Sequence, residues 1–206
     1  MHIPATFTED NPEILLQIMR DNAFATLVTT DENGLPVATP LPFLIEEKNN
    51  KVKLLAHFAK NNPQWHHLER NKTVLVIFNG PHCYVSPSWY KNAGVPTWNY
   101  VSVHVYGTAK LIEKDANTAE LIEKLSDKYE QTQTNPWKAA GNYSKKMLNA
   151  IKGFEITVQD FLGKVKIGQN KSRDDLIGVL NILNNASSEH EQGIAQLIKK
   201  HLDSKE

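Results

Sequence analysis

Residues 23–45 read AFATLVTTDENGLPVATPLPFLI and hold the clearest fold signal in this chain of 206 residues. Two runs rich in Val, Thr, Leu and Phe, at 23–30 and 36–45, flank the segment DENG at 31–34. The Asn-Gly pair of that segment suits a turn whose residues need positive φ, and such turns join neighbouring antiparallel strands. The stretch therefore predicts a β-hairpin.

Further strands are predicted on both sides of short helices. Runs at 52–58, 73–78, 82–86 and 98–112 are rich in strand-forming residues, and Val101, Val103 and Val105 alternate as in a strand with one buried face. A last strand is expected over 154–167. At least six strands, mostly antiparallel, are therefore expected.

Start signals predict the helices. Asn-Pro pairs at 11–12 and 62–63 give a cap and a proline at the first helical position, the second helix running to about residue 70. An acidic start predicts a helix over 115–130, and another is expected over 143–152. Ser172 with Asp175, and Ser188 with Glu191, fit capping boxes, so the chain is expected to finish with a helical pair over about 172–206.

This element order favours an α+β class, with a small closed or nearly closed antiparallel barrel and peripheral and C-terminal helices. The sequence contains no repeat, low-complexity tract or long Gly/Ser linker. A single domain over 1–206 is the simplest interpretation.

Composition excludes several classes of protein. No apolar run approaches the roughly 18 residues of a membrane span, and the first ten residues lack the pattern of an export signal. The single cysteine, Cys83, agrees with a reducing compartment, so we expect a cytoplasmic protein. Lys plus Arg and Asp plus Glu number 23 each, which leaves no net charge to draw the chain onto nucleic acid.

The common catalytic motifs are absent. The chain has no G-x-G-x-x-G, P-loop, G-x-S-x-G or H-E-x-x-H pattern. His66 and His67 are adjacent, so their side chains would point in different directions on a helix, and no Cys or acidic residue lies at ligand spacing. No metal site is predicted.

The segment HFAKNNPQW at 57–65 combines a strand end, the cation of Lys60 and a helix start near Asn62. The free N–H groups and dipole of a helix start favour an anion, so this segment is a candidate phosphate site. The alternative is that Lys60 is a solvated loop charge, His57 a satisfied strand residue and Asn62 only a helix cap.

Aromatic residues gather in YVSPSWY at 84–90 and VPTWNY at 95–100. Such side chains in a loop-rich region can wall a pocket for a planar ligand. The alternative is that they pack in a core or an interface, which is the commoner use. Both interpretations hold together if the ligand lies between subunits.

Six segments resemble, in order, the motifs of the PaiB family of FMN-binding transcriptional regulators. They are VATPLPF at 37–43, the 57–65 segment, YVSPSWY, VPTWNY continuing to Gly107, GFEI at 153–156 and QNKS at 169–172. The resemblance implies an FMN-binding split β-barrel, related to the pyridoxamine phosphate oxidases, that forms a homodimer with FMN at its interface. The chain differs from the family's pattern at Pro40, where the family often has His, in a shorter 91–94 loop, and at 131–142.

By this resemblance, Lys60 and the N–H groups near it would bind the FMN phosphate, and His57 would add a hydrogen bond. The second strand of the hairpin would lie along the isoalloxazine edge, the start of the 98–112 strand would close the pocket, and the last strand and its exit would contribute across the dimer. The implied cofactor-binding residues are Thr39, Pro40, Leu41, His57, Ala59, Lys60, Asn61, Asn62, Thr97, Trp98, Asn99, Lys166 and Gln169.

Two functions of different class follow from a bound flavin. The flavin itself carries redox chemistry, and no residue can be identified as a proton donor from the sequence. The chain is therefore expected to be a flavin-containing regulator, as the family's name implies, or a small flavin-dependent oxidoreductase of unknown substrate. A flavin-binding protein without turnover is a third interpretation. Direct sequence-specific DNA binding is not expected, because no basic recognition helix is visible.

Overall fold

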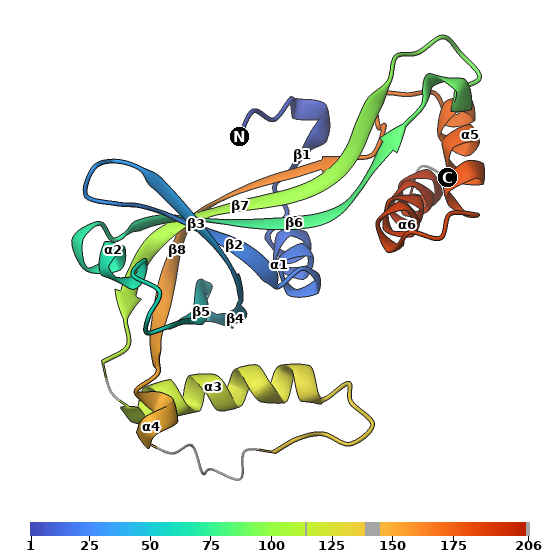
Figure 1. Ribbon diagram of the computed structural model, residues 1–206. Coiled ribbons are helices and arrows are strands. Elements are labelled where there is room, and N and C mark those ends of the chain that lie inside the picture. The colour runs from blue at the N-terminus through green and yellow to red at the C-terminus, as the bar shows by residue number, and fades with distance from the viewer. Residues whose placement is uncertain (114, 139–144, 205–206) are drawn as a thin grey trace. The chain divides into compact units, whose positions relative to one another are not determined.

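The computed structural model describes residues 1–113, 115–138 and 145–204 (Figure 1). The strands are β1 (Thr8–Glu9), β2 (Phe24–Thr30), β3 (Pro36–Pro42), β4 (Leu44–Lys48), β5 (Lys51–Ala59), β6 (Thr73–Val85), β7 (Thr97–Leu111) and β8 (Ile151–Lys166). The α-helices are α1 (Pro12–Asp21), α2 (Trp65–Arg70), α3 (Asp115–Glu130), α4 (Lys145–Leu148), α5 (Arg173–Leu183) and α6 (Glu189–Asp203), and the 3₁₀ turns are η1 (Ala5–Phe7) and η2 (Pro87–Trp89). None of the described helices has the length and apolar character needed to cross a lipid bilayer.

Within the described residues the strands form one eight-stranded sheet. Its path is β3-β2-β6-β7-β8-β5-β4, with β1 paired to β8. The pairs β2–β3, β2–β6, β4–β5, β5–β8 and β1–β8 are antiparallel. Helices and antiparallel strands together confirm the predicted α+β class.

The chain divides into two compact units. Unit 1 comprises Met1–Ile18, Asn79–Val103 and Leu162–Glu206, and unit 2 comprises Met19–Phe78 and His104–Phe161. Strands β6, β7 and β8 each have residues in both units. The single domain over 1–206 stays a prediction.

Unit 2 has a core of four fully buried phenylalanines. Phe154 of β8 stacks on Phe58 of β5 with ring centroids 4.8 Å apart, and Phe43 meets Phe154 edge-on at 6.3 Å and Phe78 at 5.9 Å. Each ring comes from a different segment, so the aromatic contacts join the hairpins of unit 2.

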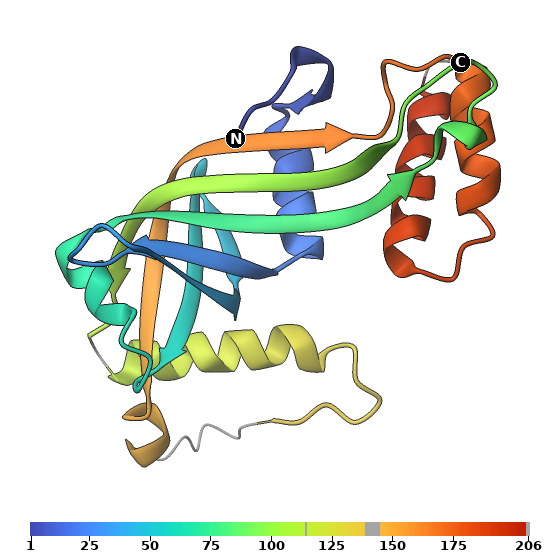
Figure 2. The same cartoon turned by 45° about the horizontal axis from the view of Figure 1, so that its top comes forward.

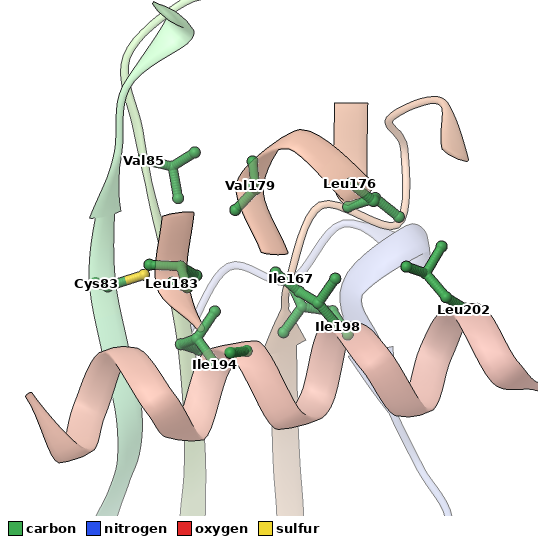
Figure 3. Close-up of a cluster of buried hydrophobic side chains, with 10 residues drawn as sticks. Cys83, Val85, Ile167, Leu176, Val179, Leu183, Ile194, Ile198 and Leu202 are labelled. Atoms are coloured by element: carbon green, nitrogen blue, oxygen red, sulfur yellow. The ribbon is translucent and has the colours of Figure 1, made fainter. Parts of the chain in front are cut away.

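Unit 1 has its own core around the C-terminal helices, which lie side by side in both views (Figures 1 and 2). Figure 3 shows Cys83 and Val85 of β6 and Ile167 after β8 meeting apolar side chains of α5 and α6. The helical members are Leu176, Val179, Leu183, Ile194, Ala195, Ile198 and Leu202. The predicted helical pair is confirmed, and it covers one end of β6.

Turn chemistry explains the two hairpins of unit 2. The predicted β2–β3 hairpin is confirmed: Gly34 has φ +82°, and the Asp31 carboxylate accepts the N–H groups of Asn33 and Leu35, both at 2.8 Å. The β4–β5 hairpin turns at 49–50, where two asparagines have φ of 52° and 59°. Asn tolerates this left-handed region better than other non-glycine residues.

Several predicted bounds differ from the structure. The expected 36–45 strand is divided at Phe43 into β3 and β4, whereas the two strands expected at 73–78 and 82–86 are one strand, β6. Of the helix expected over 143–152, residues 143–144 lie outside the described residues, α4 spans only Lys145–Leu148 and β8 already begins at Ile151. Pairing with β5 from Ile151 onward draws that segment into the sheet.

Candidate functional site

The turn between β5 and α2, in unit 2, contains Lys60. Its N–H donates to the oxygen of Ala150 at 2.8 Å, and its carbonyl accepts the indole N–H of Trp65 at 2.9 Å. The Lys60 side chain is exposed and forms no ion pair with any described residue. A cation with unused donors therefore extends from a fixed backbone.

Asn62 shapes the approach to α2. Its Oδ1 accepts the N–H of Gln64 at 2.9 Å, and its Nδ2 lies 3.4 Å from Oγ1 of Thr39. The helix begins at Trp65 rather than directly after Asn62, because the first bonds of this turn run from i to i+3. The N–H of Asn62 donates to Ala59 at 2.9 Å, so this predicted phosphate donor is already in use within the turn.

Gln64 is the residue that sequence reasoning missed. It is 1% exposed, and its Nε2 donates to Oγ1 of Thr29 and to the oxygen of Val37, both at 3.0 Å, with Leu27 O at 3.5 Å. Its Oε1 accepts the hydroxyl of Thr39. One buried amide thus fastens the turn to β2 and β3, and no local sequence signal marks it, because its partners lie 25 or more residues away.

The β3 residues of the predicted site point in alternate directions. β3 lies at one end of the sheet path, where a proline without an N–H is tolerated. Thr39 is half-buried against Gln64, Pro40 is exposed, and Leu41 is buried. Leu41 packs in the core, so Thr39 and Pro40 are the two that can offer side chains to a ligand, one from each face of β3.

His57 and Ala59 lie on β5, opposite residues of β8. Ala59 is exposed, whereas Nδ1 of His57 is buried and has no hydrogen-bond partner among the described residues. Burial lowers the pKa of His57 below its ordinary value of 6.5, so the ring is neutral at pH 7. Nδ1 of His104 in β7 is likewise buried without a described partner. Such unsatisfied ring nitrogens are groups that a bound ligand would stabilise.

The second group of predicted residues belongs to unit 1. Thr97 and Asn99 alternate with Trp98 at the start of β7: Asn99 is buried, and Trp98 is 54% exposed and meets Tyr84 edge-on at 6.2 Å. Lys166 at the end of β8 donates from Nζ to Oγ1 of Thr97 at 2.5 Å. The structure thus brings Thr97 and Lys166 together and leaves Trp98 on the other face of the strand.

Gln169 closes the turn that follows β8. Its Oε1 accepts the N–H of Ile167 at 2.9 Å, and its Nε2 donates to the oxygen of Val165 at 2.5 Å. Both polar ends of the side chain are therefore engaged within unit 1. Of the two candidates for a contribution across a dimer, Lys166 has the greater remaining hydrogen-bonding capacity.

Comparison with known proteins identifies the family. Residues 1–160 match the family model described as "Putative FMN-binding domain". The protease synthase and sporulation protein PAI 2 of Bacillus subtilis is 40% identical over 205 residues, which cover 98% of each chain. The chain belongs to the PaiB family. The matched region includes every unit 2 residue of the predicted site and ends before Lys166 and Gln169.

Solved structures show that this PaiB-family chain has the flavin-binding split-barrel fold. The flavocytochrome Anf3 of Azotobacter vinelandii superposes with a TM-score of 0.65 at 18% identity, covering 85% of this chain and 78% of that one. The FAD and heme binding protein of Mycobacterium smegmatis gives 0.61 at 19% identity, covering 82% and 78%. The predicted fold is confirmed, and the family model confirms FMN as the predicted cofactor.

Proposed function

We propose that this PaiB-family chain binds FMN non-covalently at an interface between two copies, with its phosphate held by Lys60. The state of Lys60 carries the proposal: two hydrogen bonds fix its backbone, and its ammonium has no ion pair among the described residues. A charge-assisted contact with a phosphate would use these free donors. The contribution of helix N–H groups is smaller than the sequence suggested, because that of Asn62 is taken by Ala59.

The surroundings of Lys60 fit a bound FMN. Thr39 and Pro40 offer side chains on β3, and His57 offers an unsatisfied ring nitrogen on β5. FMN, when bound, supplies redox chemistry through its isoalloxazine ring. The residues of the chain bind and orient the cofactor, and Gln64 holds Thr39 and Asn62 in place for that task.

The homodimer is supported by exposed aromatic surface in unit 1. Trp98 is 54% and Tyr84 44% exposed although their rings are in contact, and aromatic side chains are enriched at protein interfaces. We infer that this surface becomes covered when two copies associate and that Lys166 reaches the cofactor of the partner copy. Gln169 would support Lys166 by closing the turn behind it.

The proposed role is regulatory and cytoplasmic. Identity of 40% over nearly the whole length of PAI 2 supports a role of the same kind. Direct sequence-specific DNA binding is not part of the proposal, because the chain has no net charge. The first turns of α5 and α6 also carry acids, Asp174 and Asp175 in one and Glu189 and Glu191 in the other, which would repel DNA phosphates.

A small flavin-dependent oxidoreductase is the second candidate function. It is favoured by Lys166, whose pKa is lowered by burial and whose Nζ is held by Thr97. An ammonium of lowered pKa can release and take back a proton beside a reacting flavin more readily than an ordinary lysine. Bleaching of the flavin by NADH or NADPH without air would favour this candidate over the regulator.

The proposal is tested on purified protein. We expect flavin absorption bands that persist through purification or return on addition of FMN, with one FMN per chain. Light scattering should give the mass of a dimer at micromolar concentration. Protein that binds no added FMN, or that remains a monomer, would overturn the cofactor or the assembly proposal respectively.

A further inference from the structure

Lys164 in unit 1 is a buried cation whose partners among the described residues are neutral. It is 8% exposed, its Nζ donates to the oxygen of His2 at 3.1 Å, and it lies 5.0 Å from the ring centroid of Tyr100. An ammonium has three donors and loses much hydration when buried, so lysines are rarely buried without a counter-charge. Lys164 therefore retains an unmet demand for negative charge.

Lys166 lies two residues further along β8 and so on the same face of the strand. Its Nζ donates to Oγ1 of Thr97 at 2.5 Å and lies 6.0 Å from the ring centroid of Phe7, and both groups are neutral. Burial lowers the pKa of Lys166, and the positive charge of Lys164 lowers it further, against an opposing effect of Tyr100. Two cations thus share one face, and neither has an ion-pair partner in the part of the chain that the structure describes.

Among the described residues, the segments around this face supply no carboxylate that pairs with either lysine. Neither lysine forms an ion pair with a described residue. β1 pairs with this part of β8, and its single acid, Glu9, uses Oε1 to accept the N–H of Asn11 at 3.0 Å. The N-terminal segment contributes the oxygen of His2 and the ring of Phe7.

We propose that Lys164 and Lys166 form a binding site for the oxyanion group, phosphate or carboxylate, of a small molecule. The two ammonium groups supply the charge, the Thr97 hydroxyl supplies a further donor, and the rings of Tyr100 and Phe7 wall the site. This goes beyond the proposed function, which assigns the FMN phosphate to Lys60 and gives Lys164 no role. The oxyanion belongs to a second acidic molecule, because the proposed function places the phosphate of FMN at Lys60.

The test uses inorganic phosphate as the probe and the full-length chain, freed of FMN, with lysine labelled at Cε for NMR. Phosphate is added at constant ionic strength. We expect the resonances of Lys164 and Lys166 to shift together along one saturable curve. Lys164→Met and Lys166→Met should each weaken binding about tenfold or more, whereas Lys164→Arg should retain it.

Lys171→Met is the matched control. Lys171 also belongs to unit 1, and its ammonium lies 4.6 Å from the ring centroid of Tyr90, but it follows β8 and is not on the strand that carries Lys164 and Lys166. Its removal should leave phosphate binding unchanged. If the shifts do not saturate, or if Lys171→Met weakens binding as much as Lys164→Met does, the site does not exist.

A second arm repeats the titration with FMN-loaded protein. Shifts that persist identify a second acidic molecule as the source of the oxyanion. Shifts that FMN itself produces, and that phosphate then cannot add to, would overturn the proposal, because the two lysines would then belong to the FMN site. Failure of FMN to bind would overturn the proposed function but not this site, because the first arm contains no FMN.

Discussion

The indole N–H of Trp65 and the main-chain oxygen of Lys60 form a hydrogen bond of 2.9 Å across the turn between β5 and α2. Together with the bond from the Lys60 N–H to Ala150, it fixes the two peptide units on either side of the Lys60 Cα. The Lys60 ammonium is thus positioned, and it forms no ion pair with any residue that the structure describes. Trp65 acts on the candidate phosphate site through the backbone of Lys60.

Replacing Lys60 should separate a phosphate ligand from a solvated charge. In Lys60→Ala we expect FMN affinity to fall by about one to two decades, because one charge-assisted contact is worth about 1.5–3 kcal/mol. Riboflavin lacks the phosphate, so its affinity should change much less. Flavin fluorescence quenching measures both ligands, and the exposed Lys110→Ala provides the control. Equal FMN affinity in Lys60→Ala and wild type would remove Lys60 from the site.

Gln64→Leu should destabilise the protein more than most polar substitutions. The change removes the Gln64 amide from the oxygen of Val37 and from the hydroxyl groups of Thr29 and Thr39, and it leaves Thr29 with only its bond to His67. We expect the free energy of unfolding to fall by about 2–4 kcal/mol, measured by urea denaturation. Gln196→Leu, at an exposed position of α6, should stay within about 0.5 kcal/mol. Similar losses in both variants would show that the buried network of Gln64 is not the cause.

Asp175 should contribute an acid-sensitive part of the stability of unit 1. The Asn92 N–H donates to its carboxylate at 2.9 Å, and this bond, with help from Ser172 and the Asn92 side chain, lowers the pKa of Asp175 from 3.8 to about 2. The folded state thus binds this proton less readily than the unfolded state. The contribution is complete above pH 3.8 and disappears as the pH falls through about 2.

In Asp175→Asn, stability at neutral pH should fall, and its decline toward acid should become shallower than that of wild type. Urea midpoints from pH 6 to pH 2.5 would show both effects. Asp174→Asn is the control, because that carboxylate makes an exposed ion pair with Lys91. An unchanged acid slope in Asp175→Asn would contradict the assigned role.

Cys83 should be inert in the folded protein. It is 4% exposed, and burial, with a smaller effect of the Glu191 charge, raises the pKa of its thiol to about 11. Since the thiolate is the reactive form, a disulfide reagent at pH 8 should label native protein very slowly and unfolded protein at once. Leu183→Ala should accelerate native labelling by loosening the cluster of Figure 3. Rapid labelling of wild type would mean that β6 is not covered there.

Local signals in the sequence predicted most of the elements. The acidic start at 115 predicted α3 with both of its ends, and Ser172 predicted the start of α5, where its Oγ accepts the Asp175 N–H. Ser188 is also an N-cap, but its side chain makes no capping bond, so composition alone had predicted a box that does not form. Such signals locate helices better than they describe their contacts.

Strand bounds were harder to predict, because they depend on distant partners. Gly80 and Pro81 resemble a break, yet β6 continues through them. Asn49 and Asn50 form a two-residue turn with positive φ, a signal that was present in the sequence and would have revealed β4. Asn at both central positions is a recognised composition for such turns.

The candidate site was predictable only in part. Motif resemblance located Lys60 and His57, whose chemistry can be read from residue type. The buried role of Gln64 and the pairing of Lys164 with Lys166 depend on tertiary contacts, with Thr29 in one case and with His2 in the other. Periodicity could not distinguish these polar residues from solvated ones, because hydrogen bonds between distant segments decide their burial.

The family match ends at residue 160, but the core of unit 1 contains residues from both sides of that position. Cys83 and Val85 belong to the shared region, whereas the helices that cover them lie wholly after it. A chain shortened at residue 160 would therefore expose an apolar strip on β6, and we expect it to aggregate even though it retains the matched region. The region that matches the FMN-binding family and the helices that protect the apolar end of β6 from solvent thus lie in different stretches of the same chain.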